Sequence, residues 1–384
     1  MTNKNELGQF DTPKHISSSL MSLFPYHYDF FIDLGAGLGN LSHQFHQRNG
    51  ALVELDLVRV KNLQKNSNSN INVIHSDVLD SSLNLNQLSE GYEKVLYLSN
   101  PPFHRKSSGY KFTYFDSLNT GTPFHQLDIA FLDKVLSSMN SKSSVAFIVS
   151  APFVEFEKYK NEREKFINSF DFIEVIRLDM KTFAQAEVQS YAIIGHVISA
   201  TLAQKILLKS MDVQGKITDV LDITHEQAIV SLSYSYHKDV QYLKDLIGKG
   251  FKTVGDFNIE LSRGSQSKKY FHDLGKDFIH TTDLVNQYLY LDSHEFDERF
   301  SAAEQNDILI SRVGRRSILR QSLVKKGGKV FTDSVYRLKT ETKDNDLIWK
   351  SISSEVGQKW RALHAQGKCA KYLTCSAILS IPVI

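Results

Sequence analysis

The chain has 384 residues, of which 41% are hydrophobic and 23% charged, and its formal net charge is +2. This length exceeds that of one ordinary domain and predicts two domains, each with enough apolar residues for its own core. No apolar run approaches the ~20 residues of a membrane helix, and the N-terminus lacks the apolar stretch of a secretory signal. We therefore expect a soluble, cytoplasmic protein with no membrane partner.

Cysteine content and charge distribution narrow the class of protein further. Cys369 and Cys375 are too few for a disulfide framework, and their spacing with His364 is irregular for a zinc site, so we expect no bound metal. Residues 201–384 carry 27 Lys and Arg against 22 Asp and Glu, and residues 312–339 hold nine basic residues and one acid. Such a run can be a solvated surface, but its charge is large enough to attract a polyanion.

The first motifs lie near the N-terminus. Gly8-Gln9-Phe10-Asp11-Thr12-Pro13 is a polar turn, and we expect a helix over residues 14–23 with Asp11 or Thr12 as its N-cap. Residues 30–34 are an apolar strand that ends in Asp33-Leu34-Gly35-Ala36-Gly37-Leu38-Gly39. Glycines at alternate positions let the backbone approach a ligand and then turn into a helix, whose free N–H groups favour anionic oxygens. The spacing differs from the dinucleotide pattern G-x-G-x-x-G, so a nicotinamide cofactor fits poorly.

Two acids follow at the ends of the next expected strands. Residues 51–55 form an apolar strand with Glu54 near its end, where nucleoside-binding α/β folds hold a ribose diol. Residues 71–74 form a third strand, and Asp77 after it is placed to accept from an adenine amino group. Taken singly, Glu54 can equally be a helix-capping acid and Asp77 a solvated turn residue. The ordered set of Asp33, the glycines and both acids is much less expected by chance.

The turn Asn100-Pro101-Pro102-Phe103 follows a fourth strand, residues 95–98, and is therefore expected at the sheet edge where open α/β folds bind ligands. The two prolines fix φ and remove two backbone donors, which leaves carbonyl oxygens free to accept beside one amide and one aromatic ring. Such a turn can hold a planar amino group and make it nucleophilic, although an ordinary strand-ending turn can have the same pattern. We interpret it as the catalytic centre.

The segment after this turn mixes basic and aromatic residues. Arg105 and Lys106 in it are candidates for DNA contact, with an ordinary surface loop as the alternative. Residues 145–149, 172–178 and 190–197 complete about seven strands with helices between most of them. The pattern predicts a doubly wound α/β sheet.

The ordered motifs GQFDTP, DLGAGLG, the strand-end Glu54, HSDV around Asp77 and NPPF resemble those of S-adenosyl-L-methionine-dependent DNA adenine-N6 methyltransferases, in the order of the gamma group. The resemblance covers roughly residues 6–198. It implies a class I (Rossmann-like) methyltransferase fold with S-adenosyl-L-methionine as cofactor. The glycine loop would bind the methionine part, and Thr12 and Pro13 would help to close over it. Glu54 would bind the ribose hydroxyls and Asp77 the cofactor's adenine.

The segment Phe183-Ala184-Gln185-Ala186-Glu187-Val188 resembles the part of the same family whose aromatic ring packs on the flipped target adenine. Phe183 and Phe103 would then stack on the two faces of the base. An adenine inside a duplex has to leave the stack before it can react, and aromatic stacking helps to offset that cost. A position in the core is the alternative for Phe183.

The remaining chain gives a looser pattern. Residues 201–238 are mixed and polar, and we expect them to connect a catalytic domain, residues 1–200, to residues 239–384. The last part contains Ser262-Arg263-Gly264-Ser265 and the run from Asn306 to Gly314, and it resembles one target-recognition domain of the specificity subunits of Type I restriction systems. This resemblance implies an α+β DNA-recognition domain. In it, we expect Arg312, Arg315 and Arg316 to contact double-stranded DNA.

The motifs together imply a site-specific, adenine-specific DNA methyltransferase that uses base flipping, as the modification enzyme of a restriction-modification system. Any cognate restriction endonuclease would be encoded separately, because the chain has no convincing nuclease motif. Ribosomal RNA adenine-N6 methyltransferases are an alternative, but they have a non-proline in the middle of the catalytic turn. Protein glutamine methyltransferases share the NPP-aromatic turn but do not require a basic C-terminal half. A non-catalytic DNA-specificity module with a decayed methyltransferase domain is the alternative from another class.

Overall fold

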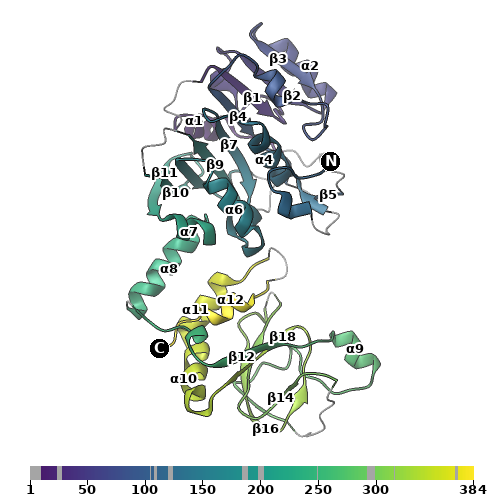
Figure 1. The fold of residues 1–384 in the computed structure, drawn as a ribbon, viewed down its shortest axis with the longest axis vertical. Helices are drawn as coiled ribbons and strands as arrows, with labels where there is room; N and C mark the ends of the chain where they lie inside the picture. The colour runs from purple at the N-terminus through teal and green to yellow at the C-terminus, as the bar shows by residue number, and fades with distance from the viewer. Residues whose placement is uncertain are drawn as a thin grey trace. The chain divides into compact units, whose positions relative to one another are not determined.

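The chain forms two compact units, Met1–Tyr234 and Ser235–Ile384 (Figure 1). The structure is a computed structural model, and it describes residues 10–23, 28–103, 105–107, 110–119, 124–183, 189–197, 203–248, 250–291, 299–314, 316–367 and 371–384. Within these ranges, the side chains of residues 105–107, 124 and 125 are not described.

A nine-stranded sheet, counted over the described residues, forms the centre of the first unit in the order β11-β10-β8-β9-β7-β4-β1-β2-β3. The strands β3, β2, β1, β4 and β7 are parallel to one another, and β9 runs antiparallel between β7 and β8. The nine strands are β1 (Phe30–Leu34), β2 (Gly50–Glu54), β3 (Ile71–His75), β4 (Val95–Ser99), β7 (Ser144–Ser150), β8 (Phe172–Arg177), β9 (Ser190–His196), β10 (Lys205–Met211) and β11 (Ile217–Ile223). The expected α/β class with a large, mostly parallel sheet is confirmed.

Helices cover both faces of this sheet (Figure 1). Successive residues of a strand point to opposite faces, so Phe30 and Ile32 pack in one core cluster and Phe31 in the other. The first cluster includes residues of α4 (Leu127–Ser138), α5 (Ala151–Glu155) and α6 (Lys160–Ile167). The second includes residues of α1 (Lys14–Met21) and α2 (Leu57–Asn66). The unit also contains α3 (Leu85–Leu88), β5 (Arg105–Ser107), β6 (Phe124–Gln126) and the short 3-10 helices η1 (His43–Phe45), η2 (Asp116–Asn119) and η3 (Glu157–Tyr159).

Two strands come from the segment 201–238, which we expected to be a connection. β10 pairs with β8 and β11 pairs with β10, and α7 (His225–Val230) follows them in the same unit. The buried guanidinium of Arg163 in α6 ties the end of this segment to the sheet domain by donating to the carbonyl oxygens of Ile229 and Val230. The segment looks mixed and polar in sequence because β11 exposes alternate residues, as an edge strand does.

A five-stranded sheet, again counted over the described residues, forms the centre of the second unit in the order β12-β18-β15-β16-β13. Its pairs are antiparallel except for β13 with β16. The helices α10, α11 and α12 contribute Ile348, Trp360 and Ile378 to one core cluster, and a smaller cluster contains Leu309 and Val324. The elements are α8 (Tyr234–Ile247), η4 (Val254–Asp256), β12 (Ile259–Arg263), α9 (Lys268–Asp273), β13 (Tyr288–Tyr290), β14 (Ala302–Ala303), β15 (Ile308–Ser311), β16 (Gln321–Lys326), β17 (Lys329–Val330), β18 (Val335–Thr340), α10 (Thr342–Ser353), α11 (Glu355–His364) and α12 (Cys375–Leu379).

No helix in the described parts of either unit is long and apolar enough to span a bilayer.

Candidate functional site

The glycine loop and the Asn100 turn meet at the carboxyl ends of β1 and β4. These two strands are parallel neighbours with Leu34 paired to Ser99, and the Ser99 hydroxyl donates to the Leu34 carbonyl oxygen at 2.6 Å. The chain passes from β1 to β2 and β3 on one side of β1 and returns to place β4 on the other side. A sheet opens a crevice at such a switch in strand order, because the connections on its two sides diverge.

The glycine loop follows β1 with three residues in the left-handed region. Gly35, Gly37 and Gly39 have φ of 68°, 61° and 73°, values that residues with a Cβ rarely adopt. The backbone N–H groups of Gly35 and Ala36 both donate to the Val53 carbonyl oxygen, at 2.8 and 3.0 Å. We expected a helix after this loop, but the chain forms turns and the three-residue 3-10 helix η1 instead.

Glu54 holds the glycine loop in place from the end of β2. Its two carboxylate oxygens accept from the backbone N–H groups of Gly37 and Asp56, both at 2.8 Å, and the residue is buried. Asp77 lies after β3, where its Oδ1 accepts from the Leu79 backbone N–H at 2.9 Å. Both acids are at the strand ends that the sequence indicates. Their predicted roles toward a ribose and an adenine stay predictions.

Asp33 is a buried carboxylate at the end of β1 whose Oδ2 has no hydrogen-bond partner within the described residues. Burial is the main reason that the pKa of Asp33 is raised to about 7. A hydrogen bond from Ser42 opposes the shift, and the charge of Glu54 adds to it. A buried acceptor without a partner costs about 1–3 kcal/mol, which a ligand that donates to it can recover.

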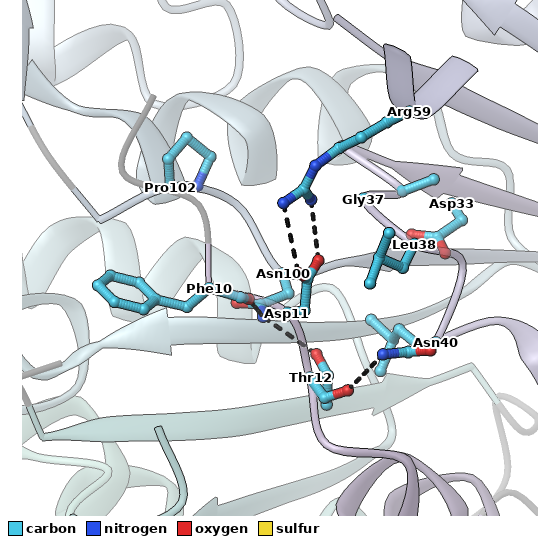
Figure 2. A pocket seen from close by; sticks show the side chains of 13 residues that line it. Phe10, Asp11, Thr12, Asp33, Gly37, Leu38, Asn40, Arg59, Asn100 and Pro102 are labelled. Atoms are coloured by element: carbon cyan, nitrogen blue, oxygen red, sulfur yellow. Dashed lines mark hydrogen bonds and ion pairs between the residues drawn. The ribbon is translucent and has the colours of Figure 1, made fainter. Parts of the chain in front are cut away.

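The N-terminal segment crosses the site beside the glycine loop (Figure 2). We expected Asp11 or Thr12 to cap the next helix, but α1 begins after Pro13 without a side-chain cap. Asp11 instead forms a two-point ion pair with Arg59 of α2, with N–O distances of 2.8 and 3.3 Å. The Thr12 carbonyl oxygen accepts from the Asn40 amide at 3.0 Å. Both residues are therefore used in tertiary contacts, Asp11 through its side chain and Thr12 through its backbone carbonyl. Gly8 and Gln9 of the same motif lie outside the described residues.

The side-chain amide of Asn100 is fixed by this segment. Its Nδ2 donates to the Phe10 carbonyl oxygen at 2.7 Å and to the Thr12 hydroxyl oxygen at 3.0 Å (Figure 2). A carbonyl oxygen can only accept, so the amide nitrogen has to face Phe10, and this fixes the orientation of the amide. The Asn100 Oδ1 atom is consequently the acceptor that the side chain can offer to a ligand.

One pocket brings together the N-terminal segment, the glycine loop and the Asn100 turn (Figure 2). Six of the predicted site residues line it: Thr12, Asp33, Gly35, Gly37, Asn100 and Pro102. Seven other residues predicted for catalysis, base stacking or cofactor binding are not among its lining: Pro13, Gly39, Glu54, Asp77, Pro101, Phe103 and Phe183. The sequence did not point to Arg59 or Asn40, which also line the pocket. No motif marks them, because both reach the site through tertiary contacts with the N-terminal segment.

The two predicted stacking aromatics lie near the same core cluster. Phe183 is 5% exposed and belongs to the cluster that contains residues of α1, whereas Phe103 is partly buried and packs against that cluster. Gln185 and Val188 lie outside the described residues. In this arrangement Phe103 has surface to offer and Phe183 has little, so a role of Phe183 in stacking requires a local rearrangement.

The predicted DNA-contact residues are described unevenly. Arg105 and Lys106 lie in β5, which pairs with β6, but their side chains are outside the described part, as is all of Arg315. Arg316 is exposed. Arg312 is partly buried, and its Nε donates to the Asp333 carbonyl oxygen at 2.7 Å.

Comparison with solved structures finds similarity to restriction-modification proteins. The type IIG restriction endonuclease BpuSI aligns with 99% of this chain and 59% of its own, at a TM-score of 0.51 and 13% identity. A type I restriction-modification methyltransferase subunit from Streptococcus thermophilus aligns with 65% of this chain and 55% of its own, at a TM-score of 0.42 and 14% identity. DrdV in complex with DNA aligns with 58% of this chain and 31% of its own, at a TM-score of 0.46 and 15% identity.

The similarity to BpuSI shows a common fold, and this chain spans about three fifths of the BpuSI chain. No protein-family model matches the sequence, and no curated protein matches it.

Substitution of Gly37 tests the geometry of the pocket. A Cβ at Gly37 would lie 2.9 Å from Arg59 Nη1 and Asp11 Oδ1, whereas one at Gly91 would meet nothing within 4 Å. Both glycines have positive φ, so Gly37→Ala and Gly91→Ala share a backbone strain on the order of 1 kcal/mol. We expect Gly37→Ala to lower the urea midpoint further, because it also displaces the ion pair. Equal midpoints for the two variants would contradict this geometry.

Proposed function

We propose that this protein is a site-specific DNA methyltransferase that transfers a methyl group from S-adenosyl-L-methionine to adenine N6 in double-stranded DNA, with the target base flipped out of the helix. The observation that carries the proposal is the fixed amide of Asn100, whose Oδ1 is left as an acceptor at a pocket that also contains the glycine loop. The common fold with a restriction endonuclease supports a role in a restriction-modification system.

The chemistry of the pocket fits the cofactor. Gly35 and Gly37 expose their backbone to the pocket without a Cβ, and the unpartnered Oδ2 of Asp33 is an acceptor for a cationic group such as an α-ammonium. In this proposal Thr12 and Pro13 border the methionine part, Glu54 holds the ribose hydroxyls and Asp77 the adenine. S-adenosyl-L-methionine would supply an electrophilic methyl group on its sulfonium.

The catalytic turn would activate the target amine by accepting its two N–H bonds. The Asn100 Oδ1 atom accepts one and the Pro101 carbonyl oxygen the other, which concentrates the nitrogen lone pair toward the methyl group. No general base is needed before the attack, because the methylated nitrogen loses its proton readily afterwards. The rate then depends on how accurately the protein positions the amine, and the two hydrogen bonds that fix Asn100 serve that purpose.

Double-stranded DNA is the proposed carrier of the adenine. The basic run between Arg312 and Lys339 in the second unit provides charge for a polyanion, and the proline pair distinguishes the catalytic turn from that of ribosomal RNA adenine methyltransferases. Phe103, with Phe183 after rearrangement, would stack on the flipped base. A restriction endonuclease on a separate chain is the proposed functional partner.

Asn100→Ala is the direct test of the function. We expect it to reduce tritium transfer from labelled S-adenosyl-L-methionine to duplex DNA by about 10²-fold or more, because an acceptor on the reacting amine is lost. Cofactor affinity, measured by calorimetry, should change little. Asn86→Ala on the exposed surface of α3 is the control and should keep wild-type activity. Undiminished transfer by Asn100→Ala would exclude this residue as the catalytic acceptor.

Thr12 is expected to position Asn100. Thr12→Val keeps the shape of the side chain but removes the hydroxyl that accepts from Asn100 Nδ2, so the amide loses one of two anchors. We expect kcat to fall about tenfold with little change in KM for the cofactor, and Thr12→Ser to restore most of the loss. Steady-state kinetics with both substrates varied provides the measurement. Equal kcat values for the Val and Ser variants would show that the hydroxyl does not act on Asn100.

The pKa of Asp33 predicts how cofactor binding depends on pH. Burial raises this pKa to about 7 in the free protein, and a cationic cofactor next to Asp33 would favour the ionised carboxylate. The affinity for the cofactor should therefore rise with pH and level off once Asp33 is already ionised in the free protein. Well below pH 7, it should fall by about tenfold for each pH unit. Calorimetric titrations between about pH 5.5 and 8 check this. Asp33→Asn should bind more weakly and without this pH dependence; a flat wild-type profile would contradict the assignment.

A further inference from the structure

Two Ser-Arg pairs far apart in the sequence reach the same edge of the second sheet. β12 and β15 lie on opposite sides of β18 and are both antiparallel to it, so they run in the same direction. Arg263 at the end of β12 pairs with Tyr336, and Ser311 at the end of β15 pairs with the adjacent Val335. Arg263 and Arg312 therefore leave the sheet at the same end of β18, one on each side of that strand.

One backbone oxygen anchors both arginines. The Asp333 carbonyl accepts from Arg263 Nε at 3.1 Å and from Arg312 Nε at 2.7 Å. Because both contact the same atom, the two Nε atoms are no more than about 6 Å apart. Arg263 Nη2 also reaches the Asp333 carboxylate, at 3.5 Å. A guanidinium has five N–H donors, so each arginine retains donors for a further acceptor.

The backbone that carries the two arginines is held in place. The Arg312 N–H donates to Ser334 and its carbonyl oxygen accepts from Leu373, both at 2.9 Å. Gly264 follows Arg263 and packs against the backbone at Thr332, just before β18. A Cβ at Gly264 would lie 2.3 Å from the Thr332 carbonyl oxygen. The two guanidinium groups thus project from a preorganised edge, which lowers the entropy lost on binding a ligand.

The charges at this edge are only partly balanced. The Asp333 carboxylate lies 3.5 Å from Arg263 Nη2, and Arg312 forms no salt bridge with a carboxylate in the described residues. Burial lowers the pKa of Arg312, and the nearby charge of Arg263 lowers it further. Two neighbouring guanidinium groups with one shared acid leave an excess positive charge that a bound anion would neutralise.

We propose that Arg263 and Arg312 together form one binding site for a backbone phosphate of the DNA. A phosphodiester carries a negative charge and two exposed oxygens, so it can accept from both guanidinium groups and relieve their repulsion. The edge of a guanine offers neutral acceptors to a single arginine, and this fits a repelling pair less well. The site would fix the position of the second unit on the duplex without reading its sequence. DNA as the source of the phosphate follows from the proposed function.

The test measures DNA binding by the full-length protein as a function of salt. Arg263→Gln and Arg312→Gln are compared with Lys359→Gln, which removes the same charge from an exposed lysine paired with Glu355 on α11. Fluorescence anisotropy with a labelled duplex gives log Kobs against log salt concentration. We expect each arginine variant to lower the magnitude of the slope by about one unit, as for the loss of one phosphate contact. The double variant should match the single ones, because both residues serve the same phosphate.

The possible outcomes separate this site from its alternatives. Slopes equal to that of Lys359→Gln, together with a lower urea midpoint, would show that the arginines only support the Asp333 turn and would overturn the proposal. Micromolar binding of inorganic phosphate that the variants abolish, without any change in DNA binding, would assign the site to a small anion and equally overturn it. Methyl transfer is assayed separately at saturating DNA with the wild-type protein and with Lys359→Gln, which lies outside the proposed site and should keep wild-type kcat. Changed slopes in a protein without transferase activity would support the site and contradict the proposed function.

Discussion

The candidate site depends on the parallel pairing of β1 with β4. This pairing brings the start of the glycine loop and the start of the Asn100 turn to adjacent positions, although the two are far apart in the sequence. The same edge receives the N-terminal segment, which contacts Asn40 after the glycine loop, Arg59 of helix α2 and Asn100 of the proline-containing turn. A change at any of these contacts should therefore reach the others, since all of them hold the same three residues, Phe10 to Thr12.

The two buried acids of the pocket region have different physical roles. Glu54 accepts two backbone N–H groups and so stabilises the loop that it holds. Asp33 keeps one carboxylate oxygen without a hydrogen-bond partner, and burial raises its pKa, so it does not stabilise the free protein as Glu54 does. Its unpartnered oxygen is available to a cation. The two acids look equivalent in sequence, but only Glu54 has both of its carboxylate oxygens hydrogen-bonded in the free protein.

The second unit uses its charges in two ways. Along β18, Arg337 and Lys339 are paired with the acids Glu260 and Glu304, and these pairs hold neighbouring segments together. At the end of the same strand system, Arg263 and Arg312 share a carbonyl oxygen and only one nearby carboxylate. The positive charge of the run between residues 312 and 339 is therefore balanced by acids at some positions and not at others.

Local chemistry in the sequence determined a large part of this protein. Apolar runs indicated seven strands of the first sheet, alternate glycines indicated a loop whose backbone can approach a ligand, and the proline pair after residues 95–98 indicated a turn at a strand's carboxyl end. These features depend on neighbours in the chain, so they can be read without the fold.

Only the tertiary structure decided which partners each residue has. In the folded chain, β10 and β11 belong to the sheet, and Asp11 and Thr12 make long-range contacts in place of a helix cap. The glycine loop is followed by a short 3-10 helix and not by an α-helix. The tertiary structure also fixed the Asn100 amide and brought Arg263 to Arg312. Strand order and register set these contacts, and both result from packing across the whole unit, which a local pattern does not contain.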